Sequence, residues 1–197
     1  MGEKRFLTYD EQITFLEKEK GLIISNKEYA KKILLKIGYF PLINGYKEIF
    51  KEPNNNQFQK GTSFEDIYEL YDFDNDLRNI FIKYILLAER NIKSSLSYHF
   101  CKEYGDLQSD YLNVNNYERL QIPKEKGRYT YGKNDLYAQV IILKLLLSTE
   151  DFHKFFHDLK MCFKKHSIHK EILGKMGFPE NWQRIGRIKN YIKSEIL

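Results

Sequence analysis

The side chains best suited to chemistry in this sequence are its five histidines and two cysteines. His153 and His157 are four positions apart, and His166 and His169 are three apart with Cys162 nearby. On a helix this spacing places each pair on one face, which suits zinc. However, lysines surround these residues, and no acidic residue completes a known metal signature. We therefore expect no metal site and no cofactor.

Other catalytic signatures are missing from the sequence as well. It contains no glycine-rich phosphate loop, no nucleophile elbow and no DNA-reading signature. The net charge of +5 and the pI near 8.9 favour a polyanionic partner. From His153 to the end there are ten Lys or Arg against four Asp or Glu. A solvated, lysine-rich surface explains the same charge equally well, so charge alone does not identify the partner.

The longest periodic run covers residues 61–105 and predicts the central helices. Thr62 and Glu65 have the spacing of a capping box that opens a short first helix. After an acidic group at 72–76, a longer helix is expected from about Asp76 to Tyr104, because apolar residues recur there at steps of three and four. The positions expected to be buried in this helix are Leu77, Phe81, Ile85, Ala88 and Ile92.

The segment before this run predicts a pair of helices and an aromatic turn. Thr8 and Glu11 form another capping-box spacing, and Ser25 or Asn26 caps the second helix. The stretch GYFPLINGY at 38–46 holds two glycines, a proline and three aromatic residues, which is typical of a packed turn.

The segment after the central run begins with an irregular connector. Residues 106–134 lack helical periodicity, and RYTY at 128–131 is compatible with one arm of a small hairpin within residues 122–132. Further helices capped by Asp135 and Ser148 follow, and then a basic tail. We expect an all-α, compact helical bundle in a single domain. Its parts are residues 1–60 (helical pair and turn), 61–105 (central helices), 106–134 (connector) and 135–197 (C-terminal helices and basic tail).

Compartment and membrane association follow from two further features. No apolar run reaches the roughly 18 residues that a membrane span needs. The first segment, residues 2–7, is short and charged, so it does not resemble a secretory signal. The two cysteines stand in helical contexts, which favours a reduced, cytoplasmic protein. We therefore expect no membrane contact.

Several blocks of this sequence resemble the abortive-infection (Abi) D/F-type family of bacterial phage defence. RFLTYDEQITFLEKEKGLII resembles the start of that family, and GYFPLINGY resembles its aromatic turn, with Phe40 and Pro41 where Tyr and Arg are commoner. FQKGTSFEDIYELYDFDNDLR resembles its most recognisable block, and ERNIKSSLSYHFCKEYG, YGKNDLYAQVIILKLLLS and KMGFPENW resemble later ones. The likeness extends over nearly the whole chain.

The resemblance implies a HEPN-type helical bundle, often dimeric, and metal-independent RNA cleavage. That activity needs an Arg, often followed by Asn, with a His four to six residues later, so that both side chains meet one phosphate. Here Arg90 and Asn91 are followed by His99, nine positions after Arg90, which turns the pair about 180° apart on a helix. Glu118, together with the Arg and Leu after it, resembles the segment that normally follows the motif, but no histidine precedes it there. A deletion of the motif, natural or engineered, is implied.

Two functions of different class remain open, and with them whether the chain is an enzyme at all. The first is an Abi-type phage-defence or toxin–antitoxin protein that binds RNA, including a structured small non-coding RNA, without cleaving it. Its expected RNA-binding residues are Lys164, Lys165, Arg184, Arg187, Lys189, Lys193, Tyr129 and Tyr131. The second is an active ribonuclease toxin, in which Arg90, Asn91 and His99 form a site across a homodimer. A third alternative is a protein-interaction remnant, that is, a chain that has kept only binding to another protein.

Overall fold

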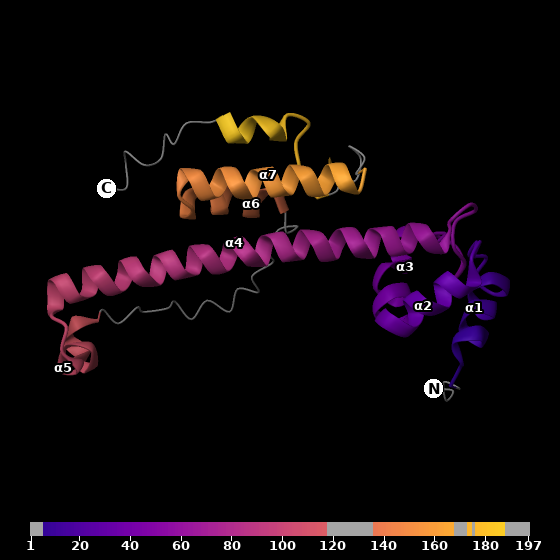
Figure 1. The fold of residues 1–197 in the computed structure, drawn as a ribbon, viewed down its shortest axis with the longest axis horizontal. Helices are drawn as coiled ribbons and strands as arrows, with labels where there is room; N and C mark the ends of the chain where they lie inside the picture. The colour runs from indigo at the N-terminus through magenta and orange to yellow at the C-terminus, as the bar shows by residue number, and fades with distance from the viewer. Residues whose placement is uncertain (1–5, 118–135, 168–172, 175, 188–197) are drawn as a thin grey trace. The chain divides into compact units, whose positions relative to one another are not determined.

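The computed structural model describes residues 6–117, 136–167, 173–174 and 176–187, and most of these residues are helical (Figure 1). Within these residues there is no β-strand, only two isolated bridges, so the all-α prediction is confirmed. The hairpin expected within 122–132 lies outside them. The α-helices are α1 (Tyr9–Lys18), α2 (Lys27–Ile37), α3 (Gly45–Phe50), α4 (Phe64–Tyr104), α5 (Gln108–Leu112), α6 (Leu136–Leu146) and α7 (Thr149–Lys165). Shorter turns are the π-helix Phe40–Asn44 and the 3-10 helices Val114–Asn116 and Trp182–Arg187.

The chain divides by its contacts into two compact units, Met1–Arg78 and Asn79–Leu197. We call them the first and the second unit and describe each by itself. The single domain expected over residues 1–197 stays a prediction. Among the described helices, none combines the length and the apolar character that crossing a membrane demands.

The first unit is built on capped helices that bury leucines. The capping box at α1 is confirmed: the Thr8 N–H donates to Glu11 Oε2 at 2.8 Å, and the Glu11 N–H donates to Thr8 Oγ1 at 3.3 Å. Asn26 caps α2, since its Oδ1 accepts from the Tyr29 N–H at 3.0 Å. With their N-termini capped in this way, α1 and α2 bury their apolar faces. The largest fully buried side chains of this unit are Leu16, Leu34, Leu42, Phe64 and Ile67.

Helix α4 begins one residue later than the sequence predicted. Its capping pair is Ser63 and Asp66, with the Asp66 N–H donating to Ser63 Oγ at 3.1 Å, rather than Thr62 and Glu65. The reason is tertiary: the Thr62 carbonyl accepts from the Ile23 N–H at 3.0 Å, and Thr62 is itself buried. This parallel bridge holds Thr62 outside the helix and leaves the capping role to its neighbour.

The prediction of two central helices was wrong, because α4 runs unbroken for 41 residues (Figure 1). No glycine or proline interrupts it, and aspartate costs a helix only a few tenths of a kcal/mol relative to good formers. Asp74 accepts a hydrogen bond from the Tyr46 hydroxyl at 2.6 Å and pairs with Arg78. Buried Phe73 and Leu77 continue the apolar pattern through the acidic group, so the helix has no reason to end there.

In the second unit, α7 packs an aromatic face against α4. The Phe155 ring meets those of Phe81 and Tyr84 edge-on, at centroid distances of 5.3 and 5.2 Å. Asp158 then accepts from both the Lys83 ammonium and the Tyr84 hydroxyl at 2.9 Å. Edge-to-face rings and a shared carboxylate fix the two helices in register.

Trp182 anchors the 3-10 helix to this unit. It is buried, and its ring lies 5.3 to 5.5 Å from those of Phe156, Phe163 and Phe178. The Ser148 cap of α7 is also confirmed, since Ser148 Oγ accepts from the Asp151 N–H at 3.1 Å.

The expected core positions of α4 divide into two groups. Leu77, Phe81 and Ala88 are buried as predicted, whereas Ile85 is 47% and Ile92 48% exposed. Ile85 and Ile92 lie toward the edge of the helix face that carries Phe81 and Ala88 and line one groove with them, but no described side chain fills that groove, so their side chains stay half-exposed. A charge at Ile85 would therefore reach water, and the large loss of stability expected for Ile85→Asp no longer follows.

A pair of adjacent leucines on α2 tests this core. Leu34 is fully buried and Leu35 is 66% exposed. We expect Leu34→Ala to lower the free energy of unfolding by about 2–5 kcal/mol, because it leaves a cavity, and Leu35→Ala by less than about 0.5 kcal/mol. Urea unfolding followed by circular dichroism measures both. Equal losses in the two variants would contradict the burial of α2 described above.

Candidate functional site

The candidate catalytic residues lie on α4, and the helix keeps them apart. Arg90, Asn91 and His99 are all exposed. Since α4 is continuous from Phe64 to Tyr104, the nine residues from Arg90 to His99 turn the two side chains to opposite faces, about 180° apart. The nearest aromatic partner of the His99 ring is Tyr98, 5.4 Å away edge-on. One chain therefore does not direct Arg90 and His99 at the same phosphate.

The expected RNA-binding residues are only partly within the described chain. Lys164 and Lys165 are exposed in the last turn of α7, and Arg184 is exposed in the 3-10 helix that Arg187 ends. Lys189, Lys193, Tyr129 and Tyr131 lie outside the described residues. The structure thus places three of the basic side chains in solvent, in the second unit.

The histidines in and directly after α7 differ in burial. His153 and His157 are exposed, whereas Cys162 and His166 are buried. Because nine residues separate His157 from His166, these two point to opposite sides of the helix. The structure thus separates the exposed pair His153 and His157 from the buried pair Cys162 and His166, and His169 lies outside the described residues. The expectation of no metal site stays a prediction.

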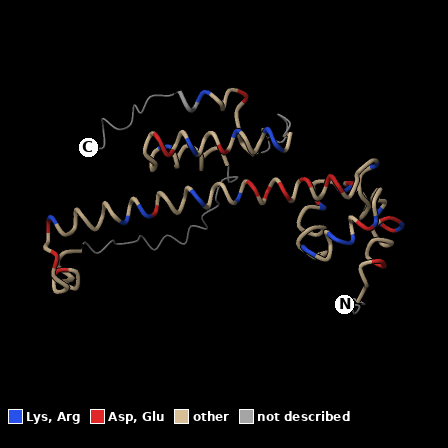
Figure 2. Tube along the Cα trace, viewed as in Figure 1, with Lys and Arg blue, Asp and Glu red and all other residues tan. Residues whose placement is uncertain are grey.

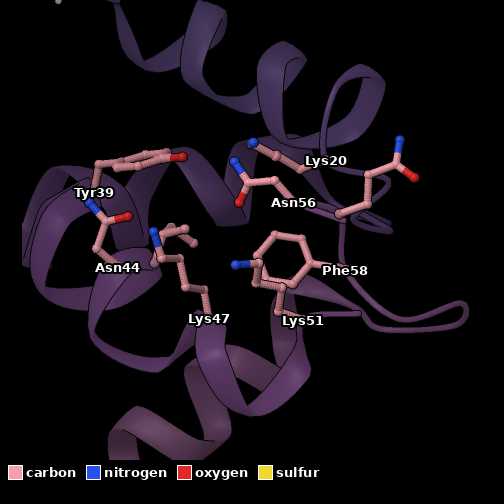
Figure 3. Close-up of a pocket in the computed structure, with 9 residues that line it drawn as sticks. Lys20, Tyr39, Asn44, Lys47, Lys51, Asn56 and Phe58 are labelled. Carbon is pink, nitrogen blue, oxygen red and sulfur yellow. The ribbon is translucent and has the colours of Figure 1, made fainter. Parts of the chain in front are cut away.

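A hollow in the first unit gathers lysines that the sequence reasoning missed. Lys20 follows α1, Lys47 lies in α3, and Lys51 directly follows α3, yet all three line one hollow of about 50 Å³ and are half-buried. Figure 3 shows their amino groups turned into the same space as the Tyr39 hydroxyl and the Asn56 side chain. The complete lining is Lys20, Tyr39, Ile43, Asn44, Lys47, Lys51, Asn56, Gln57 and Phe58.

Backbone hydrogen bonds bring these segments together. The Phe58 N–H donates to the Lys20 carbonyl at 2.8 Å, which ties the end of α1 to the loop after α3. Lys51 and Phe58 form an antiparallel bridge, with the Gln59 N–H donating to the Phe50 carbonyl at 2.8 Å. The only local sequence signal was Lys47 and Lys51 at i, i+4, which share a face if α3 extends that far.

The comparisons with known proteins give one match. The family model for Abi-like proteins matches residues 32–192. This chain belongs to the Abi-like protein family. No curated protein and no solved structure matches it significantly.

The family match covers most of the features described above. Within this Abi-like chain the matched range holds all of α4 and two of the pocket lysines, Lys47 and Lys51, while Lys20 precedes it. Arg90 and His99 also fall inside it. Membership therefore supports an abortive-infection type of protein.

The Abi-like chain has a second concave feature, an apolar groove of about 490 Å³ between α4 and α6. Ile85 and Ile92 of α4 face Ile142 and Leu146 of α6 across it, and all four side chains are 43% to 52% exposed. Glu89 and Lys93, which pair with each other at 2.6 Å, also line the groove. A surface this apolar is typical of a contact with another protein.

Because Arg90 and His99 are exposed, they can be replaced with little effect on the fold. We expect Arg90→Ala and His99→Ala each to change the free energy of unfolding by less than about 0.5 kcal/mol, because neither side chain is buried. Thermal and urea unfolding check this. Phe81→Ala, which changes a core residue, serves as the comparison and should lower the free energy of unfolding by about 3–5 kcal/mol. A large loss in either Ala variant would mean that the side chain supports the fold.

Proposed function

We propose that this Abi-like protein is a cytoplasmic phage-defence protein of HEPN type that binds RNA and does not cleave it alone. The observation that carries the proposal is where its positive charge lies. Residues 79–197 hold 20 Lys or Arg against 13 Asp or Glu, whereas residues 1–78 hold 12 against 14. Figure 2 shows the same trend along α4, with acidic residues near its start and basic ones further on. An excess of this kind attracts a polyanion.

RNA is preferred over DNA because of the residue types that accompany the charge. Lys164, Lys165 and Arg184 are exposed and suit phosphate contacts, and aromatic residues are abundant for stacking on unpaired bases. The sequence contains no DNA-reading signature. A structured small non-coding RNA, with loops that present unstacked bases, fits this chemistry.

The RNA proposal predicts a steep dependence of affinity on salt. If the six basic residues proposed above each contact one phosphate of single-stranded RNA, affinity falls roughly 300-fold between about 50 and about 200 mM salt. Lys164→Gln should reduce the slope of log affinity against log salt concentration by about 0.7. Lys32→Gln, which changes an exposed lysine of the first unit, serves as the control. Fluorescence anisotropy measures both. Absence of binding to any RNA at low salt would favour the protein-interaction reading.

The second candidate is an active endoribonuclease assembled from two copies, and the apolar groove favours it. Ile82, Ile85, Ile92 and Leu96 form an exposed stripe on α4 at nearly heptad spacing. Antiparallel pairing about Asn91 would place Glu89 beside Lys93 of a second copy. In that register the two-fold axis passes near Arg90, and His99 lies about 12 Å from the axis, measured along the helix. Cleavage across the dimer would need an axis between residues 94 and 95 instead.

Cleavage of a uridine-rich RNA distinguishes the two candidates. We expect no cleavage by the chain alone, because Arg90 and His99 are on opposite faces of α4. The comparison includes wild type, His99→Ala and Ile85→Asp. Sedimentation measures the mass of each in solution and shows whether Ile85→Asp is monomeric. Robust wild-type cleavage that is lost in both variants, with Ile85→Asp monomeric, would establish the two-copy site. Cleavage that persists in His99→Ala would point to a contaminating nuclease.

A further inference from the structure

The lysine hollow of the first unit places three positive charges together without an acidic residue among its lining. Lys51 Nζ forms a long ion pair with Glu48 Oε1, at 3.9 Å, and the Glu48 side chain is 70% exposed. Lys20 lies 5.3 Å from the centre of the Phe15 ring, and no ion pair is found for Lys20 or Lys47 in the described chain. Half-burying three like charges is unfavourable unless an anion joins them.

A neutral donor also lines the hollow. Burial raises the pKa of the Tyr39 hydroxyl, so at neutral pH this group keeps its proton and can donate a hydrogen bond. The side chains of Asn44 and Asn56 also line the hollow, and Figure 3 shows their amide oxygens on its side. Three ammonium groups and a hydroxyl donor that line one hollow suit a ligand that only accepts hydrogen bonds, which is the property of an ionised phosphate.

The size of the hollow limits what enters it. The hollow has a volume of about 50 Å³, small beside the roughly 300–1,000 Å³ of a typical small-molecule pocket, so a group the size of a phosphate suits it better than a base with its ribose. Buried Ile43 and Phe58 close the hollow on the apolar side. The rest of any phosphate-bearing ligand must therefore remain outside.

We propose that this hollow binds one phosphate group of a nucleotide, either from a free nucleotide or from an RNA chain. Lys20, Lys47 and Lys51 supply the charge, and Tyr39 supplies a neutral donor. The site lies in the first unit, away in sequence from the basic residues 153–197, and does not depend on the RNA proposal above.

Titration of the full chain with three probes tests the site. Inorganic phosphate and uridine 5′-monophosphate should bind, and uridine, which lacks the phosphate, should not, as measured by calorimetry and amide chemical shifts. Lys47→Gln should weaken phosphate binding by about tenfold, because it removes a charge-assisted contact. Lys36→Gln removes the same charge from an exposed position of α2 and should leave binding unchanged. Lys51→Gln replaces Lys47→Gln if the latter does not fold.

The results separate the source of the phosphate and the two proposals. If inorganic phosphate displaces RNA, and Lys47→Gln weakens RNA binding more than Lys36→Gln, the phosphate belongs to RNA. If phosphate binds while RNA affinity stays equal in both variants, the ligand is a free nucleotide. Phosphate binding without any RNA binding would defeat the RNA proposal alone. Equal effects of Lys36→Gln and Lys47→Gln on phosphate, or no phosphate binding, would overturn this site.

Discussion

The continuity of α4 is the constraint on which most of this structure depends. A helix of 41 residues without a break holds every side chain at a fixed angle and height relative to the others. That rigidity buries Phe81, Tyr84 and Ala88 on one face, and it separates Arg90 from His99. A kink between these two would change their angle, but the segment holds neither Gly nor Pro to produce one. The separation of Arg90 from His99 within one chain is thus a consequence of helix geometry.

The same regularity accounts for the apolar groove. An α-helix whose middle is apolar on nearly all sides must leave part of that surface uncovered unless neighbours surround it. In the second unit α7 covers the face around Phe81 and Tyr84, and the face with Ile85 and Ile92 opens into the groove beside α6. Burial of this surface by a second copy is favourable for the same reason that the core is, namely removal of apolar area from water.

The lysine hollow depends on a different kind of constraint, a small set of backbone hydrogen bonds. The Phe58 N–H and the Lys20 carbonyl join segments 38 residues apart in sequence, and the bridge at Lys51 turns the intervening loop back on α3. These contacts hold like charges closer than they would lie in a free chain. Such an arrangement opposes folding electrostatically, and it is tolerated where an anion or water compensates.

The sequence by itself determined the helical class, the caps at Thr8, Asn26 and Ser148, and the opposite orientation of Arg90 and His99. All of these follow from residue type and local periodicity, which act within a few turns of one chain segment. Tertiary structure decided the rest. The bridge between Ile23 and Ser63 moved the α4 cap, helix packing left Ile85 and Ile92 exposed, and long-range hydrogen bonds gathered Lys20, Lys47 and Lys51. Periodicity says which residues share a face of a helix, but which neighbour covers that face depends on contacts between segments distant in sequence.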